Sequence, residues 1–153
     1  MSPGPDEPVA IRRASRSDVD RLVPLFGAYR EFYRQPPDPV AERRFLDRRL
    51  AAEEAVVFLA EASGAAIGFT LLYPVFSSER LKPGWILNDL YVVPEHRARG
   101  VGAGLLRRAA QFARESGAAF VSLETAKDNP AQRLYAAEGW VRDDVFLHFE
   151  KPV

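Results

Sequence analysis

Apolar residues recur along the chain with the two spacings that distinguish helices from strands. Ser17 and Asp20 resemble a capping box, and apolar residues at helical spacing follow them as far as Tyr33. A proline-rich break at residues 35–39 separates this helix from a second one, predicted over residues 40–52. Short apolar runs predict strands at residues 9–12, 55–60, 66–73 and 85–93, with residues 74–84 as a polar connection before the last of them.

The pattern changes in the second half of the chain. A glycine-rich start at Gly100 predicts a helix, and residues 119–124 read as the strand that follows it. Asn129 and Pro130 are typical of another helix start, and a final strand is predicted over residues 140–150. Hairpins in the first half and crossover helices in the second indicate a mixed sheet with the element order βααβββαβαβ.

This order predicts one α/β domain over residues 9–153, preceded by a flexible tail at residues 1–8. The 21 basic residues balance the 21 acidic ones, so no global positive field favours nucleic acid. The absence of cysteine excludes thiolate nucleophiles and zinc–thiolate sites, and two histidines are too few for an ordinary histidine metal cluster. No signal peptide or membrane helix is expected, which makes the cytoplasm the default location.

The most informative segment runs from residue 87 to residue 106, where a strand ends, the chain turns and a helix begins. Backbone N–H groups at such a helix start have no partner in the helix and attract anions. Gly100, Gly102 and Gly104 allow close approach of a phosphate, and Arg97 and Arg99 add positive charge. The alternative is a glycine-rich turn that only packs a helix against a sheet.

Neither of two familiar nucleotide motifs fits this segment. A P-loop requires Gly-Lys-Ser/Thr, which is absent here. A dinucleotide fingerprint would need glycine or alanine where Leu105 stands and an acidic residue near Phe120. A nicotinamide cofactor is therefore not expected.

The Arg97-x-x-Gly100-x-Gly102 pattern, after the strand at residues 90–94, resembles motif A of the GNAT superfamily of acetyltransferases. Residues 129–140 are similar to the family's motif B. The resemblance covers residues 9–150 and implies a GNAT fold: a central mixed, mostly antiparallel twisted sheet of six or seven strands with about four helices. It also implies acetyl-CoA as donor, no metal, and a homodimer.

The resemblance further implies which residues hold acetyl-CoA. The main chain of the central strand would pair with the pantetheine arm like an added strand, and the Val92 N–H would donate to the thioester carbonyl. Asn129 is a possible further contact, although the family's asparagine usually lies at the position of Asp128 here. The cofactor-binding residues expected in this way are Leu90, Tyr91, Val92, Arg97, Ala98, Arg99, Gly100, Val101, Gly102, Ala103, Gly104, Asn129 and Tyr135.

By the same resemblance Tyr135 lies beside the CoA sulfur and is the expected general acid. The general base stays open between two candidates on the central strand and a water. Asn88 occupies a position that is commonly acidic, and Asp89 lies next to it. Because successive strand residues face opposite sides, Asp89 needs a bulge to replace a base at residue 88. The water would be held by Asn88, backbone carbonyls and Glu124.

The acceptor is expected to contact the first two helices and the connection at residues 74–84. The predicted substrate-binding residues are Tyr29, Phe32, Tyr33, Phe76, Ser77 and Glu124. The favoured function is acetyl transfer from acetyl-CoA directly to a primary amine of a small molecule, such as an amino acid or polyamine. A protein or peptide amine is the nearer alternative, and a non-catalytic sensor of acyl-CoA is the alternative from another class.

Overall fold

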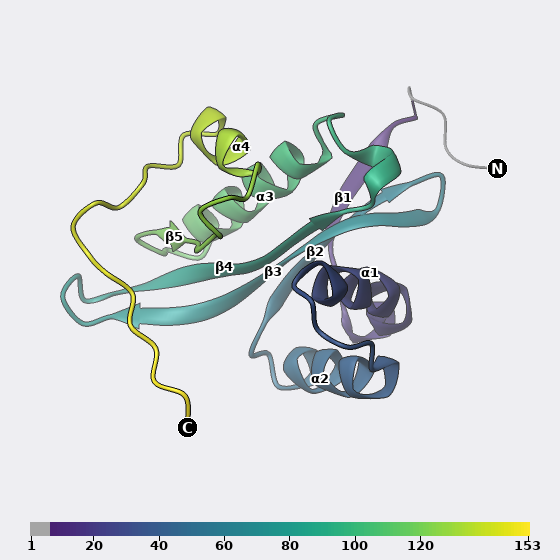
Figure 1. Cartoon of the computed structure of the whole chain (residues 1–153), viewed down its shortest axis with the longest axis horizontal. Coiled ribbons are helices and arrows are strands. Elements are labelled where there is room, and N and C mark those ends of the chain that lie inside the picture. Colours follow the sequence, from purple (N-terminus) through teal and green to yellow (C-terminus); the bar gives the residue numbers. More distant parts are fainter. Residues whose placement is uncertain (1–6) are drawn as a thin grey trace.

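Five strands form one twisted sheet in the computed structural model of the chain, which describes residues 7–153 (Figure 1). The first four strands are antiparallel neighbours in chain order, and the fifth runs parallel to the fourth. The strands are β1 (Val9–Arg13), β2 (Val56–Ala62), β3 (Ala65–Ser77), β4 (Lys82–Val92) and β5 (Val121–Ser122). The predicted mixed, mostly antiparallel α/β architecture is confirmed.

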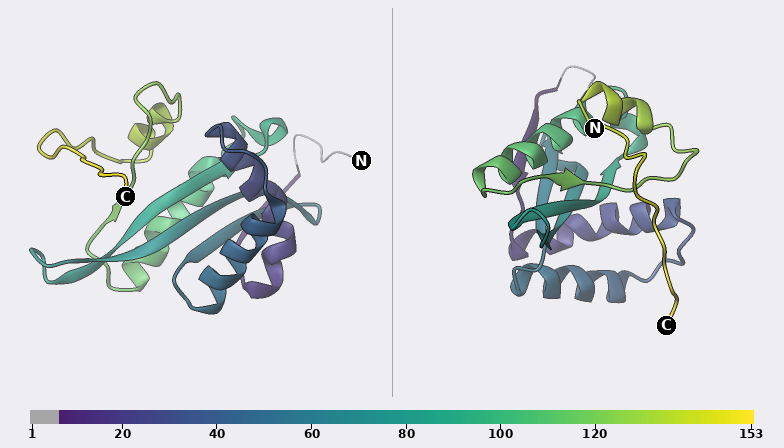
Figure 2. Two further views of the ribbon diagram at one scale, coloured as in Figure 1. Left: turned by 60° about the horizontal axis from the view of Figure 1, so that its bottom comes forward. Right: turned by 90° about the vertical axis from the view of Figure 1, so that its left-hand side faces the viewer.

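Helices cover both faces of this sheet (Figures 1 and 2). The first two lie on one face, and the last two lie on the other. The helices are α1 (Val19–Phe32), α2 (Pro39–Ala51), α3 (Val101–Glu115) and α4 (Gln132–Ala137), with short 3-10 turns η1 (Arg16–Asp18) and η2 (Pro94–His96). The four α-helices agree with the predicted number. Of the predicted tail at residues 1–8, the first six lie outside the described residues.

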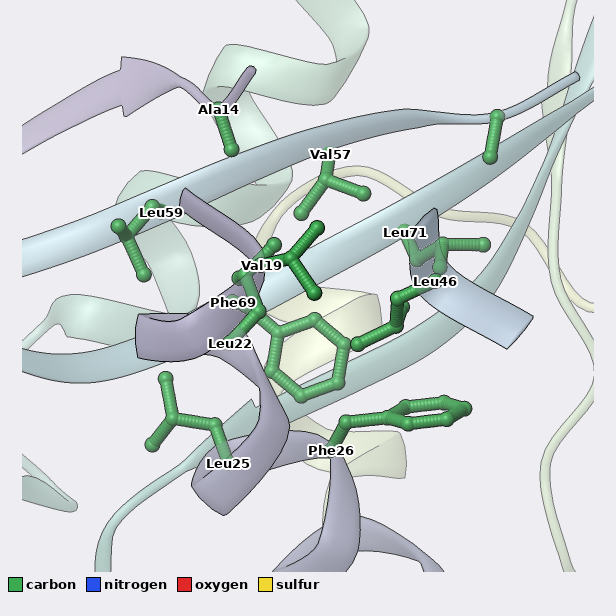
Figure 3. Close-up of a cluster of buried hydrophobic side chains, with 11 residues drawn as sticks. Ala14, Val19, Leu22, Leu25, Phe26, Leu46, Val57, Leu59, Phe69 and Leu71 are labelled. Atoms are coloured by element: carbon green, nitrogen blue, oxygen red, sulfur yellow. The ribbon is translucent and has the colours of Figure 1, made fainter. Parts of the chain in front are cut away.

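Two hydrophobic clusters hold the layers together. Val57, Leu59 and Phe69 face α1 and α2 in the first cluster, which Figure 3 shows around Phe26. Phe58 faces α3 in the second cluster. Because alternate strand residues point to opposite faces, a strand covered on both sides needs apolar residues at every position. This explains why residues 56–60 of β2 form a continuous apolar run.

The start of α1 differs from the prediction. The capping box is formed by Ser15 and Asp18, not by Ser17 and Asp20. The Ser15 N–H donates to the Asp18 carboxylate at 2.8 Å, and Arg12 donates to the same carboxylate in a two-point contact. The 3-10 turn η1 thus begins the helical segment earlier than the apolar spacing indicated.

The predicted polar connection at residues 74–84 is wrong. Most of it continues the β3–β4 hairpin, in which Pro74 lies opposite Trp85 and Ser77 lies opposite Lys82. Proline lacks an N–H and is tolerated in a strand only where that edge has no ladder to support. Pairing of β2 with β3 ends at Leu72, so Pro74 lies beyond the reach of β2. The proline therefore marks the end of one ladder instead of the end of the strand.

The predicted final strand at residues 140–150 is also wrong for this structure. The chain from Trp140 onward has no assigned strand, and the predicted strand at residues 119–124 is reduced to Val121–Ser122. The sheet has five strands in place of the expected six or seven. A strand needs a neighbouring edge to supply its hydrogen bonds, and residues 141–153 leave the body of the molecule without meeting one (Figure 2).

Candidate active site

The sheet opens between β4 and β5. These strands pair only at Trp85–Val121 and Ile86–Ser122, and beyond Ile86 they diverge. Val93 donates its N–H to Ile67 on β3 at 2.9 Å. Because backbone groups of successive strand residues point to opposite edges, those of Val92 point into the opening. The carbonyl of Val92 accepts there from Arg97 Nε at 2.8 Å.

The N-terminus of α3, here called the mouth of the helix, lies beside the end of β4. Gly100 precedes the helix with φ of 82°, a left-handed conformation that glycine adopts without strain. The first bond of the helix runs from the Gly104 N–H to the Gly100 carbonyl at 2.9 Å. The amides of Val101, Gly102 and Ala103 thus precede the intrahelical ladder and are free to bind an anion.

The other two glycines of the motif have a packing role. A Cβ on Gly102 would lie 3.1 Å from Leu134 Cδ2 on α4. A Cβ on Gly104 would lie 2.8 Å from Ile11 Cδ1 on β1. Their small size therefore brings α4 and β1 close to the first turn of α3, which is the packing alternative raised by the sequence. Of the three glycines, Gly100 is the one whose positive φ requires glycine.

Some polar side chains around this mouth already contact other residues, and others have no hydrogen-bond partner. Arg97 folds back over the Tyr91 ring, 5.5 Å from its centroid. Asn129 Oδ1 accepts from the Ala131 N–H at 2.9 Å and orders the turn that leads into α4. His96 is buried, and neither of its ring nitrogens has a hydrogen-bond partner among residues 7–153. Arg99 and Ala98 lie in the exposed turn before Gly100.

A β-bulge at Asn88 decides which face of the sheet Asp89 occupies. Leu71 pairs with Asp89, but the next residue of β3, Leu72, pairs with Leu87. Asn88 is therefore the extra residue, and it reverses the alternation of faces along β4. Leu87 packs towards α3, whereas Asp89 shares the face of Leu71, under α1. The bulge that Asp89 requires to take over from residue 88 is present.

Asp89 is a buried carboxylate with polar neighbours. It is 2% exposed and accepts from Asn88 Nδ2 at 2.7 Å. The Tyr29 hydroxyl donates to the Asn88 carbonyl at 3.2 Å and lies near the Asp89 carboxylate. Burial raises the pKa of Asp89 to about 6, and the hydrogen bond from Asn88 and the nearby Tyr29 hydroxyl oppose that rise. A carboxyl with such a pKa can take up and release a proton near neutral pH.

Three tyrosines surround this carboxylate. Burial raises the pKa of Tyr29 and Tyr33 above the usual phenol value, and the negative charge of Asp89 adds to the effect. The pKa of Tyr73 rises to about 12 for the same two reasons. All three hydroxyls thus remain protonated around Asp89 at neutral pH. Tyr73 was missed by sequence reasoning, although its spacing from Phe69 and Leu71 places it on their face of β3.

Tyr135 belongs to the layer of α3 and α4, on the other face of the sheet from α1. It lies on α4, packs against Trp140 with ring centroids 6.4 Å apart, and is half-buried. Burial raises its pKa, Tyr33 adds to the rise, and the nearby Thr125 side chain opposes it. Asp89 raises the pKa of Tyr33, and Tyr33 raises that of Tyr135, so the end of α1 lies near both expected catalytic groups. Thr125 is a second residue that the sequence did not single out.

Several predicted substrate-binding residues lie elsewhere. Phe76 and Ser77 are near the tip of the β3–β4 hairpin, with Phe76 five residues along β3 from the partner of Asp89, or about 16 Å. Phe32 is exposed at the end of α1, where it packs on Tyr33. Glu124 is exposed after β5 and contacts His148 at 3.1 Å. Of the predicted set, the structure brings Tyr29 and Tyr33 to Asp89.

Residues 7–153 contain no group of three or more histidine, aspartate or glutamate side chains that could hold a metal ion. None of the helices described there has both the length and the apolar character needed to cross a membrane.

The sheet thus splits beside a helix start whose first amides have no intrahelical partner. Comparison with known proteins then identifies the family. The model of the acetyltransferase (GNAT) family matches residues 22–140. The chain belongs to this family and is an N-acetyltransferase of the GNAT type.

Relatives of known sequence and structure agree with this assignment. An uncharacterized N-acetyltransferase of Bacillus subtilis strain 168, named YhfO, is 45% identical over 140 residues, which cover 91% of this chain and 94% of the relative. A crystal structure of a probable acetyltransferase matches with a TM-score of 0.89 and 41% identity over 94% of this chain and 97% of the other. An aminoglycoside N-acetyltransferase in complex with CoA shares the fold at a TM-score of 0.80, with 20% identity over 100% of this chain and 99% of the other.

Proposed function

We propose that the protein transfers acetyl from acetyl-CoA directly to a primary amine of a small molecule, with the reacting groups in the opening between β4 and β5. The observation that supports the proposal is the opening between β4 and β5 beside the unpaired amides at the start of α3, together with the buried carboxyl of Asp89 and the half-buried phenol of Tyr135. The complex of a solved GNAT neighbour with CoA supports the choice of donor.

Acetyl-CoA would be held by main-chain groups. The amides of Val101, Gly102 and Ala103 are positioned for the pyrophosphate, and helix-end charge favours the anion. The open edge of β4 offers the backbone of residues 90–92 to the pantetheine amides. The Val92 N–H would donate to the thioester oxygen as negative charge develops there.

The reaction removes two protons from the ammonium nitrogen and supplies one to the CoA thiolate. A primary amine arrives mostly as ammonium, so a base must free its lone pair before nitrogen attacks the thioester carbon. In this proposal the proton goes to Asp89, through a water because Asp89 is buried. The C–N bond forms, the C–S bond breaks, and Tyr135 donates its phenolic proton to the departing CoA thiolate. The attacking nitrogen passes its second proton to the Tyr135 phenolate, and Asp89 releases the first proton to solvent, so amide, free CoA and one proton are the products.

The surroundings of Asp89 favour a cationic, unhindered amine. A buried carboxylate and three tyrosine rings attract an ammonium group by charge and by cation–π interaction. Asp89 itself is 2% exposed, so only an amine on a slender chain can approach it. This favours a small primary amine over an amine fixed on the surface of a folded protein.

An acceptor screen tests the proposal. Thiol release from acetyl-CoA is measured with polyamines, amino acids, aminoglycosides and short peptides, each against a no-acceptor control. We expect the largest kcat/KM with a small di- or polycationic amine. Turnover confined to the peptides would overturn the acceptor assignment, and tight CoA binding without turnover on any amine would favour the sensor alternative.

A charge change at the mouth of α3 tests the CoA site separately. Ala103→Asp places a carboxylate in the first helical turn, where it stabilises a helix but repels a pyrophosphate. We expect the Kd for CoA, measured by calorimetry, to rise at least about 10-fold while the thermal midpoint is unchanged or higher. Ala103→Asn is the matched neutral control and should bind CoA nearly as the wild type does. Equal CoA affinity in the two variants would place the pyrophosphate elsewhere.

A further inference from the structure

A groove runs between the outer face of α3 and β1, at the opposite edge of the sheet from β5. This surface, here called the α3–β1 groove, has a volume of about 490 Å³. Because the α3 residues that line it repeat at spacings of three and four, they share one face of the helix over about 15 Å. The lining consists of Ile11, Gly104, Arg107, Arg108, Gln111 and Arg114.

The arginines of the groove differ in how far nearby carboxylates satisfy them. Arg107 donates to Glu138 in a two-point contact, at 2.8 Å for each bond. Arg108 lies 3.9 Å from Glu115, which is beyond hydrogen-bond distance. Its Nη1 is buried and has no hydrogen-bond partner among residues 7–153. A buried N–H without an acceptor costs free energy, so a carboxylate brought into the groove would complete an interaction that the chain leaves open.

Two further arginines at the groove lack a carboxylate partner. Arg114 lines it, and Arg13 extends from β1 over the Phe112 ring, 5.2 Å from the ring centroid. Neither arginine forms an ion pair within residues 7–153. The chain as a whole is neutral, with 21 basic and 21 acidic residues. The positive charge of the groove is therefore a local feature, and it attracts negatively charged groups.

The open edge of β1 borders the same groove. β1 is the outermost strand, and within residues 7–153 only β2 pairs with it (Figure 1). Ala14, which follows β1, donates its N–H to Val57 at 2.8 Å. Because backbone groups of successive strand residues point to opposite edges, those of Ile11 and Arg13 point away from β2. The same two residues turn their side chains towards α3, so the open edge and the groove form one continuous surface.

We infer that the α3–β1 groove and the open edge of β1 dock an extended acidic segment of a partner protein. The segment adds to the sheet as a further strand and pairs with the backbone of Ile11 and Arg13. The residue opposite Ile11 has its side chain on the α3 face, and so has every second residue, about 7 Å apart. Carboxylates at these positions bind the guanidinium groups of Arg108 and Arg114.

The charges and the open edge together favour this occupant over others. A single small anion satisfies one guanidinium in a two-point contact, whereas Arg108 and Arg114 are separated by about 9 Å of helix. A second copy of β1 is repelled, because it would bring its own Arg12 and Arg13 to the same edge. A nucleic-acid strand carries enough negative charge but supplies no peptide backbone to pair with β1.

Binding of a labelled peptide tests the inference without acetyl-CoA, so the result does not depend on acetyl transfer. The probe is an eight-residue peptide that alternates glutamate and valine, and its binding is measured by fluorescence anisotropy at low salt. We expect a Kd below about 100 µM for this peptide. The same peptide with lysine in place of glutamate should not bind up to about 1 mM, because the arginines repel it.

Two exposed arginines separate local charge from overall charge. Arg114→Glu should raise the Kd for the glutamate peptide at least about 10-fold, because it replaces an attracting group in the groove with a repelling one. Arg44→Glu is the matched control, since Arg44 is also exposed but lies on α2, on the other face of the sheet. It changes the net charge equally and should leave the Kd within about twofold. Circular dichroism confirms that both variants are folded, and Arg114→Gln, which keeps a good helix former, should weaken binding in the same direction.

Hydrogen exchange followed by NMR detects the added strand itself. With saturating glutamate peptide, the amides of Ile11 and Arg13 should exchange at least about 10-fold more slowly, whereas the Arg12 amide, which faces β2, should not change.

Four results would overturn the inference. The glutamate peptide could fail to bind up to about 1 mM, or Arg114→Glu and Arg44→Glu could weaken it equally, which would assign binding to overall charge. Exchange at Ile11 and Arg13 could stay unchanged under saturation, which would exclude strand addition. Tighter binding of an eight-residue uridine oligonucleotide than of the glutamate peptide would point to a nucleic acid instead.

Discussion

Replacing Asp89 with asparagine is expected to lower acetyl transfer by about 10²-fold or more at neutral pH, because a neutral amide cannot accept the proton of the ammonium acceptor. The substitution keeps the size of the side chain and its capacity to accept from Asn88 Nδ2. The loss should appear in kcat, measured by thiol release, with the Kd for CoA unchanged. An unchanged kcat in Asp89→Asn would contradict Asp89 as the base and would assign that role to a water held elsewhere.

The pH dependence of this effect follows from the pKa of Asp89. The carboxylate is active when ionised, so the rate ratio of wild type to Asp89→Asn should be constant above pH 6 and fall towards one below it. The titration of the acceptor amine affects both proteins equally, so its pH dependence cancels in the ratio. A ratio that does not change between pH 5 and pH 8 would exclude Asp89 as the titrating base.

The same substitution should stabilise the fold. The pKa of Asp89 is about 6 in the folded protein against an ordinary value of 3.8, so the folded state binds more protons between these values. Stability contributed by Asp89 therefore falls as the pH rises through this window. At pH 7 the ionised carboxylate costs the native state about 3 kcal/mol, which Asp89→Asn removes. Urea denaturation should show equal stabilities near pH 3.5 and a more stable variant at pH 7.

Asp18 provides a control with the opposite sign. It is also buried, but the Arg12 guanidinium and the Ser15 N–H lower its pKa to about 2. Its contribution to stability is present above pH 4 and is lost as the pH falls through the folded-state pKa. Asp18→Asn should therefore destabilise the protein at pH 7. Two stabilised variants, or two destabilised ones, would contradict the opposite pKa shifts of these two buried carboxyls.

Tyr135→Phe is expected to lower kcat by about 10²-fold while leaving the KM for acetyl-CoA nearly unchanged. The substitution removes the proton donor for the departing thiolate and keeps the ring that packs on Trp140. Burial raises the pKa of Tyr135, so the hydroxyl is protonated throughout the neutral range and the loss should not depend on pH. Stopped-flow thiol release under single-turnover conditions measures the chemical step directly.

Thr125→Val tests whether the orientation of this hydroxyl matters. Thr125 Oγ1 is buried and has no hydrogen-bond partner among residues 7–153, and the nearby Thr125 side chain opposes the rise in the pKa of Tyr135. Removing it should reduce kcat by less than the loss of the phenol does. Unchanged kcat in Tyr135→Phe would remove Tyr135 from the mechanism, and a larger loss in Thr125→Val than in Tyr135→Phe would point to Thr125 itself.

Local rules predicted those parts of the molecule that depend on nearby residues. The left-handed Gly100 at the start of α3 and the apolar spacing of α1 follow from short-range sterics and helical period. The glycines at 102 and 104 were ambiguous between ligand approach and packing, because the neighbours they contact, Leu134 and Ile11, are distant in sequence. The same limit applies to Tyr73, whose position beside Asp89 depends on the pairing of β3 with β4.

The sequence by itself determined the order of helices and strands as far as α4, the glycine-rich start of α3 and the type of each candidate side chain, since these depend on local spacing and residue chemistry. Only the tertiary structure decided that a bulge at Asn88 turns Asp89 under α1, that the hairpin carries Phe76 away from the site, and that residues 141–153 lack a strand partner. The physical reason is common to all three: strand register and strand pairing are set by the neighbouring strand, and that neighbour is not adjacent in sequence.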